Sequence, residues 1–160
     1  MNQILISASA PASASRLWQV VSDLQNPQRF NPYVYEADVI DRRSGGRGVE
    51  RVCRLCGGGS HRERITDWCE GASYSGRIIQ TPLPLKDGQY TLRLVPHPGE
   101  QRCTVKLELA YRLDESRIGD AAEARRWKHQ LSEGMTRILR DLSLHACTDM
   151  PLKPVGDARP

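Results

Sequence analysis

The chain has 160 residues and a net charge of +4, enough for one domain with its own core and too short for two ordinary ones. Leu, Ile, Val and Phe supply 34 of the 160 residues, about 21%, just above the roughly 20% below which disorder is the default. No stretch reaches the roughly 20 apolar residues that a bilayer requires, and no basic segment precedes the short apolar run near the N-terminus. We therefore expect a folded cytoplasmic domain with a thin core and no membrane span.

Five cysteines are an odd number, which favours reduced thiols over a disulfide framework. Cys53 and Cys56 lie three apart on a predicted strand, so their side chains face opposite sides and cannot share a metal. No second cysteine pair accompanies them. We expect no metal site and no cofactor.

The basic residues do not indicate nucleic-acid binding. Their densest cluster, 125–128, lies within a stretch of mixed charge over 117–141, which is typical of a solvated helix face.

The first elements are short. The apolar run predicts a strand over 3–7, and apolar residues at three- and four-residue spacing predict a helix over 13–24. Pro27 and Pro32 then allow at most one helical turn between them.

Turn residues divide the middle of the chain into six predicted strands, over 33–42, 48–56, 60–68, 72–80, 88–96 and 102–113. Gly57, Gly58 and Gly59 predict a hairpin turn that needs positive φ. The last strand alternates cleanly between apolar and polar residues, so one face of the sheet is exposed to solvent and the other is covered.

A long amphipathic helix over 118–145 supplies the cover. Its apolar stripe steps by three and four residues and consists of Trp127, Leu131, Met135, Ile138, Leu142 and His145. Gly134 costs about 1 kcal/mol in a helix relative to Ala, and either a close approach to the sheet or a widened pocket would explain it. We expect one domain over 1–146 and a flexible tail over 147–160.

Consecutive strands joined by tight turns are antiparallel, and a sheet with one long helix on its apolar face curls around it. The sequence therefore predicts an α+β fold in which a curved antiparallel sheet of about seven strands wraps around a long C-terminal helix.

A resemblance to a known family is carried by Tyr74 and by five segments: 12–24, 29–34, 48–53, 63–65 and 81–84. The first segment is similar to the family's first helix, which ends in an aspartate. In the second, Phe30 stands where the family usually has tryptophan. Over about residues 3–145 the chain resembles the SRPBCC or START-like helix-grip superfamily. Within it, the chain is similar to the small bacterial polyketide cyclase/dehydrase and lipid-transport branch.

The resemblance implies a cavity between the sheet and the last helix that binds a small hydrophobic ligand of aromatic, polyketide-like or lipidic type. The candidate ligand-binding residues are Phe30, Tyr35, Tyr90, Tyr111, Met135 and Ile138. Tyrosine suits such a site because it joins an apolar ring to one hydroxyl. Ordinary core packing is an equally good explanation for each of these positions.

The alternative is an enzyme of the polyketide cyclase, aromatase or dehydratase type. Tyr74 or Glu63 would then act as acid or base while Arg51 orients an oxyanion. If Arg51 and Glu63 both point inward they would pair, as a functional or a purely structural ion pair. A register slip of one residue would instead expose them.

A third hypothesis is a partner-binding module with a vestigial cavity. An open sheet also offers an edge strand for a homodimer.

Overall fold

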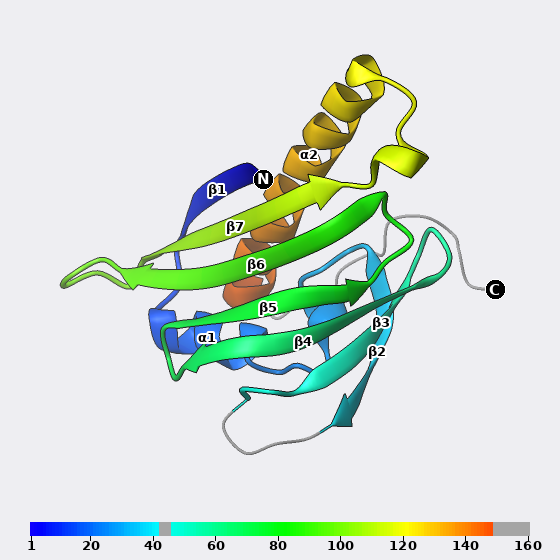
Figure 1. The fold of residues 1–160 in the computed structure, drawn as a ribbon. Coiled ribbons are helices and arrows are strands. Elements are labelled where there is room, and N and C mark those ends of the chain that lie inside the picture. The colour runs from blue at the N-terminus through cyan, green and yellow to red at the C-terminus, as the bar shows by residue number, and fades with distance from the viewer. Residues whose placement is uncertain (42–45, 149–160) are drawn as a thin grey trace.

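The computed structural model describes residues 1–41 and 46–148, and its strands form one antiparallel sheet in the order β1-β7-β6-β5-β4-β3-β2 (Figure 1). The strands are β1 (Asn2–Ala10), β2 (Val34–Asp41), β3 (Glu50–Leu55), β4 (Ser60–Cys69), β5 (Ser73–Gln80), β6 (Leu85–Pro96) and β7 (Cys103–Leu113). The helices are α1 (Ala14–Val21) and α2 (Ala121–Thr148), with 3₁₀ turns η1 (Pro27–Arg29) and η2 (Glu115–Arg117). This is the α+β architecture predicted from the sequence.

Helix α2 lies along the concave face of the sheet, where it packs against β1, β7 and α1. Figure 1 shows its first turns extending past the ends of the strands. All of its buried residues lie in its second half: Met135, Leu139, Asp141, Leu142, His145 and Ala146. The two halves of α2 therefore differ: the second half closes the core, and the first half contributes no buried residue to it.

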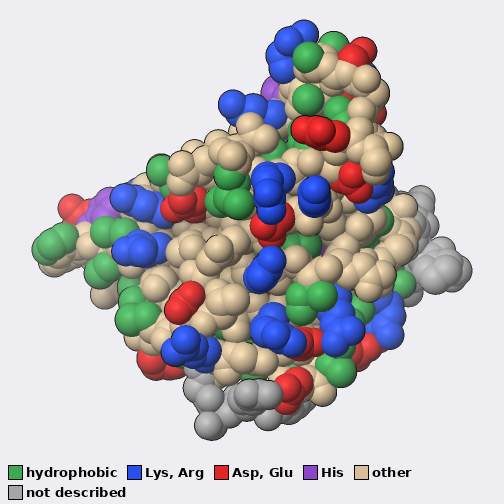
Figure 2. All heavy atoms as spheres, in the orientation of Figure 1, with side chains coloured by type: hydrophobic (Ala, Val, Ile, Leu, Met, Phe, Trp, Pro, Cys, Tyr) green, Lys and Arg blue, Asp and Glu red, His purple; other side chains and the backbone are tan. Residues whose placement is uncertain are grey.

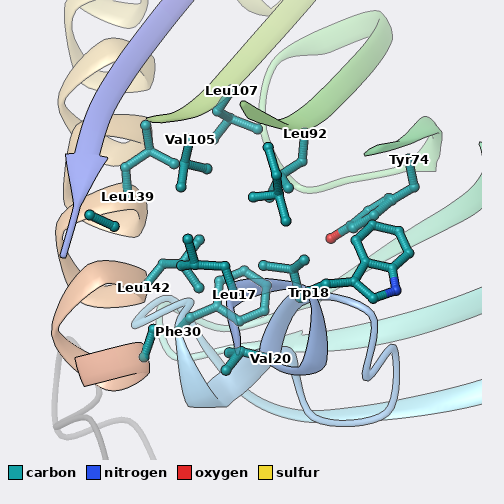
Figure 3. Packing of buried hydrophobic residues seen from close by; sticks show 14 of the residues in the cluster. Leu17, Trp18, Val20, Phe30, Tyr74, Leu92, Val105, Leu107, Leu139 and Leu142 are labelled. Carbon is teal, nitrogen blue, oxygen red and sulfur yellow. The ribbon is translucent and has the colours of Figure 1, made fainter. Parts of the chain in front are cut away.

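The core lies where α1, the second half of α2 and the middle of the sheet meet (Figure 3). Leu17 of α1, Leu92 of β6 and Leu142 of α2 are fully or almost fully buried there. Ser13 caps α1 by accepting a hydrogen bond from the Arg16 amide at 3.1 Å, which satisfies one of the free donors at the helix start.

The outer face of the sheet is polar and carries both signs of charge. Figure 2 shows Lys and Arg side chains interspersed with Asp and Glu over the strands. Glu50 of β3 accepts hydrogen bonds from Arg62 and Arg64 of β4, while Arg54 bonds Asp38 of β2 at 2.7 Å. Because the opposite charges are paired, this face resembles an ordinary solvated surface.

Two strand boundaries differ from the sequence-based prediction by three residues, and the other described boundaries differ by at most two. β1 continues to Ala10 rather than ending at residue 7, because Ser7 to Ala10 stay paired with β7 up to Cys103. β6 begins at Leu85 rather than residue 88. In both cases pairing with a neighbouring strand extends the element beyond its apolar run.

Helix α2 begins at Ala121 rather than residue 118. The 3₁₀ turn η2, capped by Asp114, comes first, and Ile118 is extended with φ −117° and ψ 122°. At the other end α2 continues through Thr148, two residues into the predicted tail, whereas residues 149–160 lie outside the described part of the chain.

The glycine turn between β3 and β4 is confirmed. Gly58 and Gly59 have φ values of 95° and 79°, in the region that favours glycine. Within residues 1–41 and 46–148, no helix is long and apolar enough to cross a membrane.

Candidate functional site

A pocket of about 520 Å³ lies between residues 127–138 of α2 and the β2 to β4 end of the sheet. Its lining residues are Pro27, Asn31, Tyr33, Val34, Arg51, Cys53, Leu55, Gly57, Gly58, His61, Glu63, Pro82, Leu83, Trp127, Gln130, Leu131, Gly134, Met135 and Ile138. Gln130, Pro82 and the glycine turn are exposed at the rim, whereas Arg51, Cys53 and Glu63 are buried at the floor. The volume lies within the range of small-molecule sites.

Two opposite charges form the centre of the floor. Arg51 of β3 and Glu63 of β4 are cross-strand partners, and they are only 6% and 4% exposed. The Arg51 Nε donates a hydrogen bond to Glu63 Oε1, and one terminal nitrogen donates to the Leu24 carbonyl at 3.2 Å. The pairing register therefore turns both side chains inward, and they neutralise each other.

The pairing fixes the charge state of both groups. Burial alone would raise the pKa of Glu63, but the Arg51 guanidinium and the His61 hydrogen bond outweigh it and lower that pKa from 4.5 to about 2. Burial opposes the charge on Arg51 as well, yet the neighbouring carboxylate keeps the pKa of Arg51 well above its ordinary value. Glu63 is therefore a carboxylate and a weak base at neutral pH.

The next cross-strand pair on the same face of these two strands is Cys53 and His61. The His61 Nε2 lies 3.2 Å from Glu63 Oε2, so the imidazole extends the polar network toward the glycine turn. Burial raises the pKa of the Cys53 thiol to about 11, so this thiol is not a nucleophile at neutral pH.

The walls above this floor are mostly apolar. Helix α2 contributes Trp127, Leu131 and Ile138, and the opposite wall includes Tyr33 and Leu55. An apolar enclosure with one polar end is the usual form of a small-molecule site.

Gly134 of α2 also lines the pocket. A Cβ at this position would have its nearest contact, the Tyr33 ring, 3.7 Å away, which is ordinary van der Waals distance. Of the two explanations for a glycine in this helix, a tight approach to the sheet is therefore not supported, and the position adds space to the pocket.

Tyr74 and Tyr90 lie next to the floor and are not among the residues that line the pocket. Burial raises the pKa of Tyr74 to about 12 and that of Tyr90 well above 10, so both are poor acids. The two rings meet edge to face with centroids 6.2 Å apart. Gly76 makes room for Tyr90, since a Cβ there would lie 2.5 Å from its ring.

Among the other sequence-predicted site residues, Arg51, Glu63, Met135 and Ile138 line the pocket. The remaining three lie outside its lining. Phe30 packs in the core, where Figure 3 shows it near Leu17 and Leu142, and Tyr111 is buried in the same core cluster. Tyr35 is half-buried beside an irregularity in the β2 pairing.

Other pocket residues were not predicted as site residues from the sequence, among them Tyr33, Cys53, His61 and Trp127. A signal for two of them was present, because residues two apart on a strand share a face. If Arg51 and Glu63 face inward, Cys53 and His61 do too. Tyr33 precedes β2, and strand alternation does not place it.

Within the described ranges, no three His, Cys, Asp or Glu residues are grouped so that they could hold a metal ion. All five cysteines lie in these ranges as free thiols, with Cys53, Cys56 and Cys103 buried.

Residues 3–145 match the model of a protein family that is described as polyketide cyclase/dehydrase and lipid transport. The chain belongs to this family. The match covers all the strands and most of α2, so the pocket lies entirely within the family region. No curated protein matches the sequence.

Solved structures share the fold at low sequence identity. A structure from Thermobifida fusca is 21% identical, with a TM-score of 0.75 over 91% of this chain and 93% of that one. A START superfamily protein from Mycobacterium smegmatis is 14% identical, with a TM-score of 0.71 over 86% of this chain and 93% of that one. These similarities establish a START-like fold.

A protein from a biosynthetic pathway is also similar in fold. The di-domain ARO/CYC StfQ from the steffimycin biosynthetic pathway is 13% identical, with a TM-score of 0.74 over 92% of this chain. The present chain spans 51% of StfQ, about half of the di-domain protein.

Proposed function

We propose that the protein binds a small hydrophobic molecule, of aromatic, polyketide-like or lipidic type, in the pocket between α2 and the sheet. The observation that carries this proposal is a pocket of about 520 Å³ with apolar walls above a floor whose charges cancel. The family description, which includes lipid transport, supports the same class of ligand.

Burial of apolar surface supplies the binding energy. At about 25 cal/mol per Å², a ligand that buries about 250 Å² of its apolar surface gains about 6 kcal/mol before the cost of association is subtracted. Because 6 kcal/mol corresponds to a dissociation constant of about 40 μM, we expect dissociation constants of tens of micromolar or weaker for compact aromatic ligands.

The charge states favour binding over acid–base catalysis by the residues first considered. Glu63 is held as a carboxylate by Arg51, and Tyr74 has a pKa of about 12. Neither group is poised to exchange a proton near pH 7. A cyclase or dehydratase reaction would need another acid or base in this pocket.

The test uses N-phenyl-1-naphthylamine, an uncharged dye whose fluorescence rises in apolar surroundings. We expect saturable binding by the wild-type protein and at least tenfold weaker binding by Ile138→Asp, which places a charge on the pocket wall. Leu144→Asp is the matched control, because Leu144 lies on the same helix, is 52% exposed and does not line the pocket.

Equal loss of binding in both variants, with both still folded by circular dichroism, would place the dye outside the pocket and contradict the proposal. Absence of saturable binding to the wild type would also contradict the proposal. Native mass spectrometry of the purified protein supplies an independent measurement, since a retained apolar molecule would identify the ligand class directly.

A further inference from the structure

The His61 imidazole is the polar group of the floor that remains open to the pocket. It lines the pocket and its side chain is 16% exposed, whereas those of Arg51 and Glu63 are 7% and 5% exposed. His61 and Glu63 share one face of β4, and the His61 Nε2 lies 3.2 Å from Glu63 Oε2. One ring nitrogen is therefore used by the protein and the other is available.

This contact determines which ring nitrogen carries the proton. A carboxylate can only accept hydrogen bonds, so Nε2 must be the donor to Glu63. In a neutral imidazole the other nitrogen, Nδ1, is then an acceptor. Within the described part of the chain, Nδ1 has no hydrogen-bond partner.

The neighbouring titratable groups of the floor are paired or neutral. The Glu63 carboxylate has a buried cationic partner in Arg51, and Cys53, which faces His61 from β3, stays a neutral thiol. Nδ1 can accept a hydrogen bond only in the neutral form of the imidazole.

We propose that His61 selects ligands that carry a neutral hydroxyl, such as a phenol or an enol, by accepting a hydrogen bond from it at Nδ1. Glu63 is the positioning residue that holds the required tautomer. A carboxylate ligand would place acceptor against acceptor and should bind less well. This inference rests on the proposed function, because it requires the apolar body of the ligand to occupy the pocket.

The binding test uses three matched probes: 2-naphthol, its methyl ether 2-methoxynaphthalene, and 2-naphthoate. Wild-type protein should bind 2-naphthol up to about tenfold more tightly than the ether, which corresponds to one net hydrogen bond. It should also prefer 2-naphthol to 2-naphthoate. In His61→Leu the ratio between 2-naphthol and the ether should fall to about one, while His61→Asn, whose side-chain oxygen can accept near the Nδ1 position, should recover part of it.

The tautomer is measured separately in the wild-type protein. Nitrogen-15 NMR of the imidazole should show a protonated Nε2 and an unprotonated Nδ1 at pH 7.5. A proton on Nδ1, whether in the other tautomer or in the doubly protonated ring, would overturn the inference. This measurement and the wild-type probe ratio stand even if a His61 variant fails to fold.

The outcomes distinguish the two proposals. Equal affinity of the wild type for 2-naphthol and its ether would overturn the role of His61 and leave the proposed function intact. A preference that persists in folded His61→Leu would also overturn it. Failure of all three probes to bind in the pocket would overturn both proposals.

Discussion

Replacing Glu63 with glutamine removes one charge of the buried pair and leaves the Arg51 guanidinium 6% exposed without its counter-ion. Breaking one side of a buried ion pair costs about 3–5 kcal/mol, because the remaining charge stays desolvated. The pKa of Glu63 gives a similar magnitude, since lowering it from 4.5 to about 2 corresponds to about 3 kcal/mol of stabilisation.

The assay is thermal unfolding followed by circular dichroism. A loss of about 3 kcal/mol in a domain of this size lowers Tm by about 6–12 °C. Asp38→Asn is the matched control: the same chemical change, also in a carboxylate bonded to an arginine, but with side chains 59% and 40% exposed. An exposed pair of this kind contributes little, so Tm should barely change.

Acid unfolding gives a second readout. Because the pKa of Glu63 is lower in the folded protein, its stabilisation is complete above about pH 4.5 and is lost as the pH falls toward 2. Glu63→Gln should remove this component of the acid dependence. A Tm loss no larger than that of Asp38→Asn, or an unchanged acid profile, would refute the reasoning about the buried pair.

Three further predictions concern single positions. Gly134→Ala should raise Tm by about 2–4 °C, because helix propensity improves by about 1 kcal/mol and the nearest atom to the new Cβ is 3.7 Å away; a fall in Tm would contradict this. Gly76→Ala should destabilise the domain by about 1–3 kcal/mol in chemical denaturation, since its Cβ would lie 2.5 Å from the Tyr90 ring, and an unchanged midpoint would argue against that contact. Cys53, with its pKa of about 11 and its burial, should react with iodoacetamide at pH 8 far more slowly than exposed Cys69, as measured by peptide mass spectrometry; equal rates would mean that the floor opens readily to solvent.

The order of elements could be predicted because each element carries its own local signal. The apolar stripe of α2 and the glycines of the β3 to β4 turn both specify local geometry that the structure reproduces. The end of β1 could not be predicted in this way, since Ser7 and Ser9 belong to the strand only through their pairing with β7.

The candidate site could be predicted only in part. Met135 and Ile138 follow from the helical stripe, but the tyrosines depend on long-range packing. Tyr90 turns toward a glycine on β5, and Tyr111 is covered by the core, neither of which local alternation reveals. Tyr33, whose position depends on the loop before β2, takes the place at the pocket that Tyr35 was expected to fill.

The uneven burial of α2 gives the molecule two regions of different local stability. Residues 135–146 are held by the core, so their amides should be the slowest of the helix to exchange with solvent. Residues 121–134 include no fully buried side chain and should open at a lower free energy, by fraying from the N-terminal end. The wall of the pocket formed by Trp127 and Leu131 is thus also its most easily opened part. Opening of this segment would widen the pocket and leave the sheet and the ion pair beneath it in place.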